Sequence, residues 1–144
     1  MTLGKRESLP RDQVVLASWA GTALFAVTSA LAVLVDSARG GAVAVDLVLF
    51  AAGTVAFVVA LARGIGRSRT EQVTLPGLFF LSGTAPADVR RQLLASAAVQ
   101  TGVAFLSAGL RPYTAVAFGI LVPVYGLGLA GLWGATRGTY APRG

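Results

Sequence analysis

The chain has 144 residues, of which 55% are hydrophobic and only 12% are charged, with a net charge of +6. Soluble domains are about 45–50% apolar and about 25% charged, so a soluble enzyme, a nucleic-acid-binding module and a disordered tail all fit this composition poorly. The chain has no Cys and no His, which excludes disulfides, thiolate metal sites and imidazole acid–base catalysis.

Four apolar segments are each long enough to cross a bilayer core, which takes about 20 mostly apolar residues in a helix. They comprise residues 13–35, 43–62, 92–110 and 114–135. The first follows a basic start but exceeds the apolar run of about 7–15 residues in a signal peptide, so we expect it to stay in the mature protein. The sequence therefore predicts an all-α membrane protein with four transmembrane helices in one domain, residues 1–144.

Basic residues are distributed unequally between the two sides of this predicted bundle. With four spans, the N-terminus, the connection 63–91 and the C-terminus share one side, and only Arg39 and Arg111 of the twelve basic residues lie on the other. Loops on the cytoplasmic side of membrane proteins carry an excess of Lys and Arg. We therefore expect both termini inside the cell and a location in a bacterial inner membrane.

Asp46 is the one acidic residue within a predicted span. It lies four residues into the second span, on the same side as Arg39 and Arg111, where it is expected to be hydrated or ion-paired. The alternative is a proton or cation site, because ionisable residues inside a membrane are functional candidates by default.

The connection 63–91 has an apolar middle between two groups of arginines. Its middle is too short to span a membrane, so it is expected to form a cytoplasmic loop lying in the interface, with Phe79 and Phe80 in lipid. The flanking arginines either set the topology or bind anionic headgroups or a partner. These are Arg63, Arg67, Arg69, Arg90 and Arg91.

Polar residues recur at similar depth in three of the spans. Thr54, Gln100 and Tyr125 all fall near the centres of their segments. A Gln amide in hydrocarbon is costly unless it is hydrogen-bonded. We expect these residues to form a structural cluster, and the alternative is a substrate site at the membrane midplane.

Small residues recur every four positions in the fourth span. Gly126, Ala130 and Gly134 form a smooth face, which favours close packing against a helix of this chain or of another subunit. Pro123 is expected to kink the span near its middle.

Two segments of the C-terminal half, residues 75–83 and 117–133, resemble small multi-pass membrane proteins of actinobacteria, a group to which no activity is attached. That resemblance implies a plasma-membrane location. Small multidrug transporters match in size and span count, but the acidic residue of their first span is absent here.

These observations favour a non-enzymatic accessory or scaffold protein whose partners are anionic membrane lipids and other membrane subunits, without nucleic acid, metal or cofactor. The alternative is a small transporter or lipid-handling protein that uses Asp46 and the midplane cluster. No catalytic motif is recognisable in the sequence.

Overall fold

The computed structural model describes residues 2–111 and 119–144, and the side chains from residue 13 onward. These residues form the helices α1 (Thr2–Leu34), α2 (Arg39–Arg67), α3 (Leu75–Phe79), α4 (Ala87–Leu110) and α5 (Pro123–Arg137), with a short 3-10 helix η1 (Asp36–Ala38) between α1 and α2. Four helical segments in the described part of the chain are long and apolar enough to cross a membrane, namely Gln13–Leu34, Asp36–Arg67, Ala87–Leu110 and Gly119–Arg137. The chain is therefore a helical protein with four candidate membrane spans.

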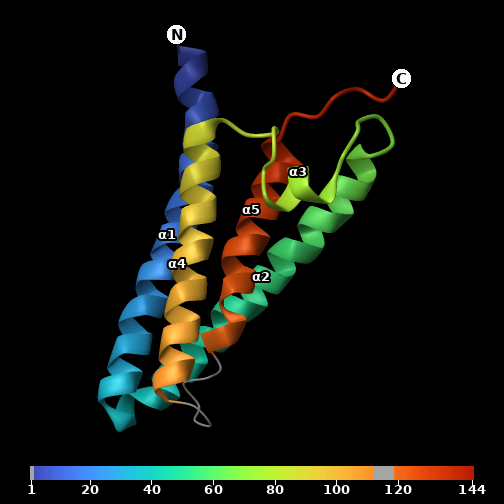
Figure 1. Cartoon of the computed structure of the whole chain (residues 1–144). Coiled ribbons are helices and arrows are strands. Elements are labelled where there is room, and N and C mark those ends of the chain that lie inside the picture. The colour runs from blue at the N-terminus through green and yellow to red at the C-terminus, as the bar shows by residue number, and fades with distance from the viewer. Residues whose placement is uncertain (1, 112–118) are drawn as a thin grey trace.

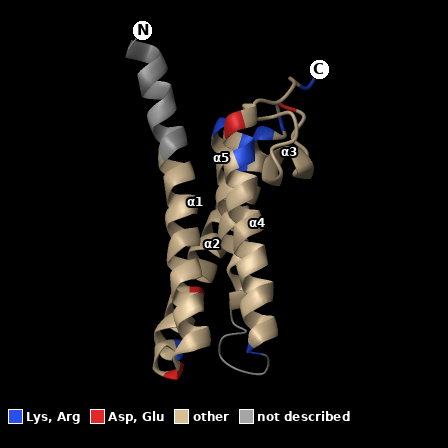
Figure 2. Cartoon of the chain, turned by 60° about the vertical axis from the view of Figure 1, so that its left-hand side comes forward, with Lys and Arg blue, Asp and Glu red and all other residues tan. Residues whose placement is uncertain are grey.

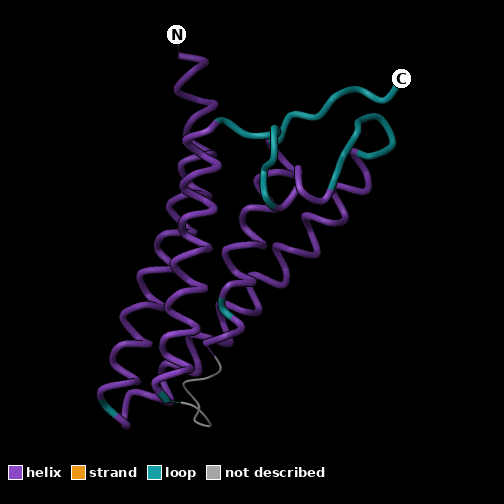
Figure 3. Tube along the Cα trace, viewed as in Figure 1, coloured by secondary structure: helices purple, strands orange, loops and turns teal. Residues whose placement is uncertain are grey.

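The long helices run in two adjacent pairs, with α1 beside α4 and α2 beside α5 (Figure 1). Both termini and α3 lie at one end of the bundle, which we call the terminal end, and η1 lies at the opposite end. Figure 3 shows that the described loops gather mostly at the terminal end. Lys and Arg also gather there, while the helical surface between the two ends is almost free of charge (Figure 2).

The boundaries of the second span differ from those expected. The span was expected at residues 43–62, but α2 begins at Arg39, continues to Arg67 and includes Gly40 and Gly41. Both glycines lie in the first turn of the helix, at the exposed end of the bundle. A Cβ atom at either position would meet no neighbouring atom within 4 Å, so no close contact requires a glycine there.

The fourth span is broken where the sequence predicted a kink. Residues 119–121 form a 3-10 turn, and α5 begins at Pro123. A proline fits the first helical turn well, because its missing N–H would have no partner there. The 15 residues of α5 reach about 22 Å, less than the roughly 30 Å of a bilayer core. Positions 114–118 of the predicted span lie outside the described residues.

Glycines let α5 pack into the centre of the bundle. A Cβ atom on Gly128 would lie 2.3 Å from the carbonyl oxygen of Gly53 in α2, and one on Gly134 would lie 2.2 Å from that of Leu78 in α3. Such backbone contact is possible only without side chains, and small residues are the usual basis of helix packing in membranes. Half of the span that contains α5 is buried inside the molecule, against 28% for each of the other three.

Candidate functional site

A polar cluster joins α1 and α4 inside the bundle. Its members Ser18 and Thr22 from α1 and Ser96 and Gln100 from α4 are all buried. The amide nitrogen of Gln100 donates to the Thr22 hydroxyl at 2.7 Å, and the Ser96 hydroxyl bonds both Ser18 and Thr22. The sequence predicted a structural role for Gln100, and in this structure its side chain bonds α1.

Gln100 also caps the start of α5. The backbone N–H of Tyr125 donates to the Val122 carbonyl at 2.8 Å, and the next N–H, that of Gly126, donates to the Gln100 side-chain oxygen at 3.0 Å. The first N–H groups of any helix need a partner from outside that helix. Gln100 supplies one in the interior of the bundle, where water is scarce.

The three residues expected to form a midplane cluster are not assembled into one. The Tyr125 hydroxyl donates to the Ala17 carbonyl of α1 at 2.6 Å, so Tyr125 and Gln100 both bond α1. Thr54 is exposed on the outer surface of α2, and its hydroxyl bonds the Phe50 carbonyl of its own helix. The inclusion of Thr54 was wrong, because the depth of a residue along a helix does not determine the direction in which it faces.

Asp46 lies apart from this cluster. Its residue surface is only 2% exposed, and its Oδ1 atom has no hydrogen-bond partner in the described part of the protein. Its Oδ2 atom lies 3.7 Å from the position that a Cβ on Gly119 would occupy, and the Phe25 ring borders the same position. The carboxyl group therefore faces the turn that precedes α5.

The expectation of a hydrated or ion-paired Asp46 was wrong. Arg39 forms an ion pair with Asp36 at 2.8 Å, and Arg111 donates to the Val33 carbonyl at 2.9 Å. The rotation of α2 about its axis turns Asp46 into the bundle rather than toward the surface. A buried carboxyl group without a partner is costly, and such groups in membrane proteins are functional candidates.

The apolar middle of the 63–91 connection packs against the bundle. Phe79 is 5% exposed and stacks on Phe57 of α2, with 4.5 Å between the ring centres. A Cβ on Gly131 of α5 would overlap the Phe79 ring, so this glycine makes room for it. The expectation that Phe79 lies in lipid was wrong, whereas Phe80 is 54% exposed.

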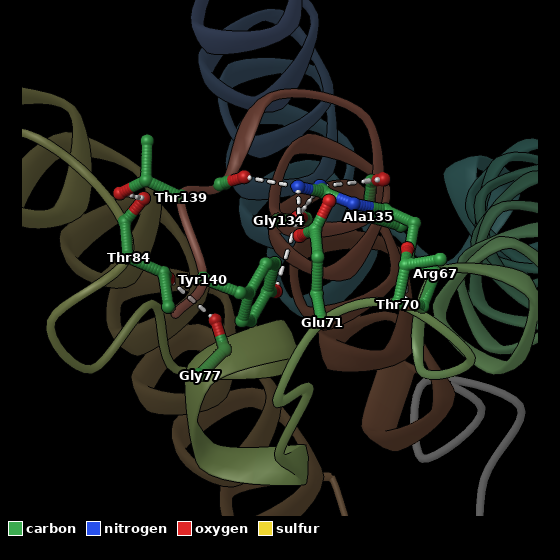
Figure 4. A network of polar contacts seen from close by, with 10 residues as sticks. Arg67, Thr70, Glu71, Gly77, Thr84, Gly134, Ala135, Thr139 and Tyr140 are labelled. Carbon is green, nitrogen blue, oxygen red and sulfur yellow. Dashed lines mark hydrogen bonds and ion pairs between the residues drawn. The ribbon is translucent and has the colours of Figure 1, made fainter. Parts of the chain in front are cut away.

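Arg67 is the centre of a network at the terminal end (Figure 4). Its guanidinium donates to the carbonyls of Gly138 at 2.8 Å and Ala135 at 3.1 Å, and it forms an ion pair with Glu71 at 2.6 Å. It also lies over the Tyr140 ring, 4.8 Å from the ring centre. Arg67 thus satisfies carbonyls at the C-terminal end of α5, where a positive charge is favourable.

Burial raises the pKa of the Tyr140 phenol, and the neighbouring Arg67 charge opposes that rise. The phenol donates to the Gly134 carbonyl at 3.0 Å. Tyr140 therefore stabilises the same end of α5 in its protonated form. Sequence reasoning missed Glu71 and Tyr140. The Arg67–Glu71 pair has i, i+4 spacing, which is a local signal, whereas Tyr140 meets Arg67 from about 70 residues further along the chain.

The other arginines of the 63–91 connection are exposed. The Nε atom of Arg90 donates to the Phe80 carbonyl at 3.0 Å. Arg63, Arg69 and Arg91 are exposed and take part in none of the ion pairs of the described residues. The arginines therefore divide into one that is structural, Arg67, and four whose charges face outward.

The stripe of small residues on α5 is covered by this chain itself. Gly126 faces Ala97 of α4, and Gly134 faces Leu78 of α3. Ala130 is fully buried in an apolar cluster with Leu81, Val89, Leu93 and Trp133.

Comparison with protein-family models, with curated protein sequences and with solved structures finds no significant match to this chain. Its function must therefore be inferred from its own residues.

Proposed function

We propose that the chain is a non-enzymatic membrane protein of the bacterial inner membrane that acts as an accessory or scaffold subunit of a larger assembly. The observation that supports this proposal is that two segments far apart in the sequence are hydrogen-bonded to each other and form one surface at the terminal end. These segments are residues 68–86 and 138–144, which together we call the cap.

The cap is held together along its length. Backbone bonds join Gln72 to Ala141 and Arg143 to Thr70, both at 2.8 Å, and the Arg67 network anchors the cap to α5. Connections between helices are usually short and mobile. A connection this long that is tied to a terminal tail offers a defined surface for a partner.

The charge on this surface indicates what kind of partner it fits. Arg69 and Arg143 are exposed on the cap, and Arg63 and Arg137 are exposed at the adjoining helix ends. Complementary charge steers association and fixes the register of docking. The proposed partner is a membrane subunit with an acidic surface on the same side of the membrane.

That side is the cytoplasm in this proposal, because ten of the twelve basic residues belong to segments at the terminal end. A reporter active only in the cytoplasm, fused after Gly144, should be active, and one inserted at residues 36–42 should be inactive. The opposite pattern would invert the orientation and move the proposed partner to the external side.

Docking is tested by purification in mild detergent, with bound proteins quantified by mass spectrometry. Arg69→Glu with Arg143→Glu reverses two cap charges and should remove the bound subunit. The matched variant Arg69→Thr with Thr70→Arg keeps the net charge but moves one arginine along the chain. Loss of the subunit in both variants supports a shaped site, whereas retention in both refutes docking through the cap.

A second candidate function is supported by Asp46, whose carboxyl group is buried and whose Oδ1 atom has no hydrogen-bond partner among the described residues. Such a group suits proton- or cation-coupled transport of a small substrate or lipid. In vesicles carrying the reconstituted protein and an internal pH dye, Asp46→Asn should abolish any proton flux. Asp36→Asn is the matched control, because Asp36 is exposed at the bundle end. Absence of protein-dependent flux in the parent would eliminate this candidate.

A further inference from the structure

A furrow of two adjoining parts lies on the surface along α4, and its second part is bordered by α5 as well. The first part lies at the terminal end, has a volume of ≈ 450 Å³, and is bordered by Arg90 and Arg91. The second part has a volume of ≈ 470 Å³, and it is bordered by Ala98 and Thr101 of α4 together with residues of α5. Leu94 borders both parts, so they adjoin at this residue.

The two parts differ in chemical character. The first presents two exposed arginines, and Asp88 of the same helical turn borders neither part. The second is lined by apolar side chains apart from Thr101, whose hydroxyl already bonds the Ala97 carbonyl of its own helix at 2.9 Å. A ligand that fits both parts has an anionic head and an apolar chain.

The length of the furrow matches one leaflet of a bilayer. Residues 90, 94, 98 and 101 are spaced so that they lie on one face of α4. The eleven steps from Arg90 to Thr101 rise about 16 Å along a helix, which is about half of the roughly 30 Å hydrocarbon core. An acyl chain beginning at the arginines would therefore end near the midplane.

We propose that this furrow binds one anionic diacyl phospholipid. Its phosphate lies against the guanidinium groups of Arg90 and Arg91, and one acyl chain follows the surface between α4 and α5 toward Thr101. Phe80, which is 54% exposed and borders the apolar part, covers the start of the chain.

The fold holds the Arg90 side chain in position without a bound lipid. Its Nε atom donates to the Phe80 carbonyl at 3.0 Å, which ties the guanidinium to the residue at the head of the apolar part. No partner for its two Nη atoms is recorded among the described residues. A planar guanidinium held in this way is suited to phosphate.

This inference does not depend on the proposed partner subunit. The docking proposal uses arginines of the cap and of the adjoining helix ends, and none of them borders the furrow. The lipid test measures what the purified chain retains, so either proposal can fail alone.

The test is native mass spectrometry of the purified full chain in detergent, with phosphatidylglycerol or phosphatidylcholine of identical acyl chains added at equal concentration. The parent should retain phosphatidylglycerol preferentially. Arg90→Gln with Arg91→Gln should weaken its binding about thirty-fold, from about 1 kcal/mol per lost charge. Arg91→Gln alone should give an intermediate loss, and it leaves the Arg90–Phe80 bond in place.

Two matched variants separate a built site from general attraction. Arg63→Gln with Arg69→Gln removes the same charge from exposed positions near the terminal end and should leave lipid binding unchanged. Ala98→Phe fills the apolar part and should weaken binding of both lipids, whereas Ala52→Phe, at an exposed position on α2, should not.

Three results would overturn the proposal. Equal retention of the two lipids by the parent would show that the head charge is not recognised. Equal losses in the two double-arginine variants would show non-specific attraction. Unchanged binding in Ala98→Phe, or displacement of the lipid by millimolar glycerol 3-phosphate, would show that the acyl chain does not occupy the furrow.

Discussion

Replacement of Arg67 should destabilise the terminal end more than replacement of any other arginine in the 63–91 connection. Arg67 bonds two carbonyls of the α5 C-terminus within 3.1 Å, pairs with Glu71 and covers the Tyr140 ring. Its side chain is 26% exposed, so these interactions are only partly screened by water.

The magnitude follows from the contacts that are lost. Hydrogen bonds to a charged group contribute about 1.5–3 kcal/mol each, and the cation–π contact adds about 0.5–1 kcal/mol. The glutamine side chain can still form some of these hydrogen bonds. We therefore expect Arg67→Gln to lower the free energy of unfolding by about 3 kcal/mol. Arg67→Lys keeps the charge near the end of α5 but loses the forked geometry, and should lose about half as much.

The assay is titration with sodium dodecyl sulfate in mild detergent, followed by helix content and tryptophan fluorescence. Trp133 is buried one residue before Gly134, so its emission reports on this end of α5. The control is Arg63→Gln, one turn earlier on α2 and exposed, which should change stability by less than about 0.5 kcal/mol. A second control, Arg67→Gln with Glu71→Gln, removes the carboxylate that the single variant leaves unpaired.

Equal unfolding midpoints for Arg67→Gln and Arg63→Gln would refute this reasoning. Such a result would show that water satisfies the α5 carbonyls as well as Arg67 does.

Four further predictions use the same titration. Ala130→Leu should cost about 1–3 kcal/mol, because a fully buried site cannot expand freely, and unchanged stability would contradict the packing. Gln100→Leu should cost about 1–2 kcal/mol by leaving the Gly126 N–H without its partner, and no loss would show that water reaches the start of α5. Asp46→Asn should leave stability unchanged or higher, because it replaces an unpartnered carboxyl, and a marked loss would reveal a partner. Burial raises the Tyr140 pKa, so its share of stability is full below about pH 10 and falls as pH rises further; Tyr140→Phe should therefore lessen the alkaline loss, and identical profiles would contradict this.

Hydropathy and charge along the chain determined the class of protein and the approximate number of spans. An apolar run of about 20 residues must satisfy its own backbone hydrogen bonds in lipid, which requires a helix, so this inference needs only local sequence. The predicted third span began at residue 92, whereas α4 begins at Ala87, where Pro86 and the acidic Asp88 are local signals for a helix start.

The direction in which each polar residue faces was decided by the tertiary structure. Asp46 is buried and Thr54 is exposed, although both lie on α2. The four spans are apolar around much of their circumference, so the sequence pattern does not reveal which face meets another helix. The rotation of each helix follows from packing of small residues, such as Gly53 against Gly128, and that packing involves partners far apart in the chain.

Two further features also needed the folded chain. Whether Pro123 kinks a helix or begins one depends on Gln100, which supplies an acceptor for the first turn of α5 from a different helix. Whether Arg67 and Phe79 face lipid or protein depends on α5 and the C-terminal tail, which cover them. Composition determined that this chain has segments apolar enough to cross a membrane, because the free energy of transfer into lipid is summed over the residues of a segment. Sites depend instead on contacts between segments, which only the tertiary structure decides.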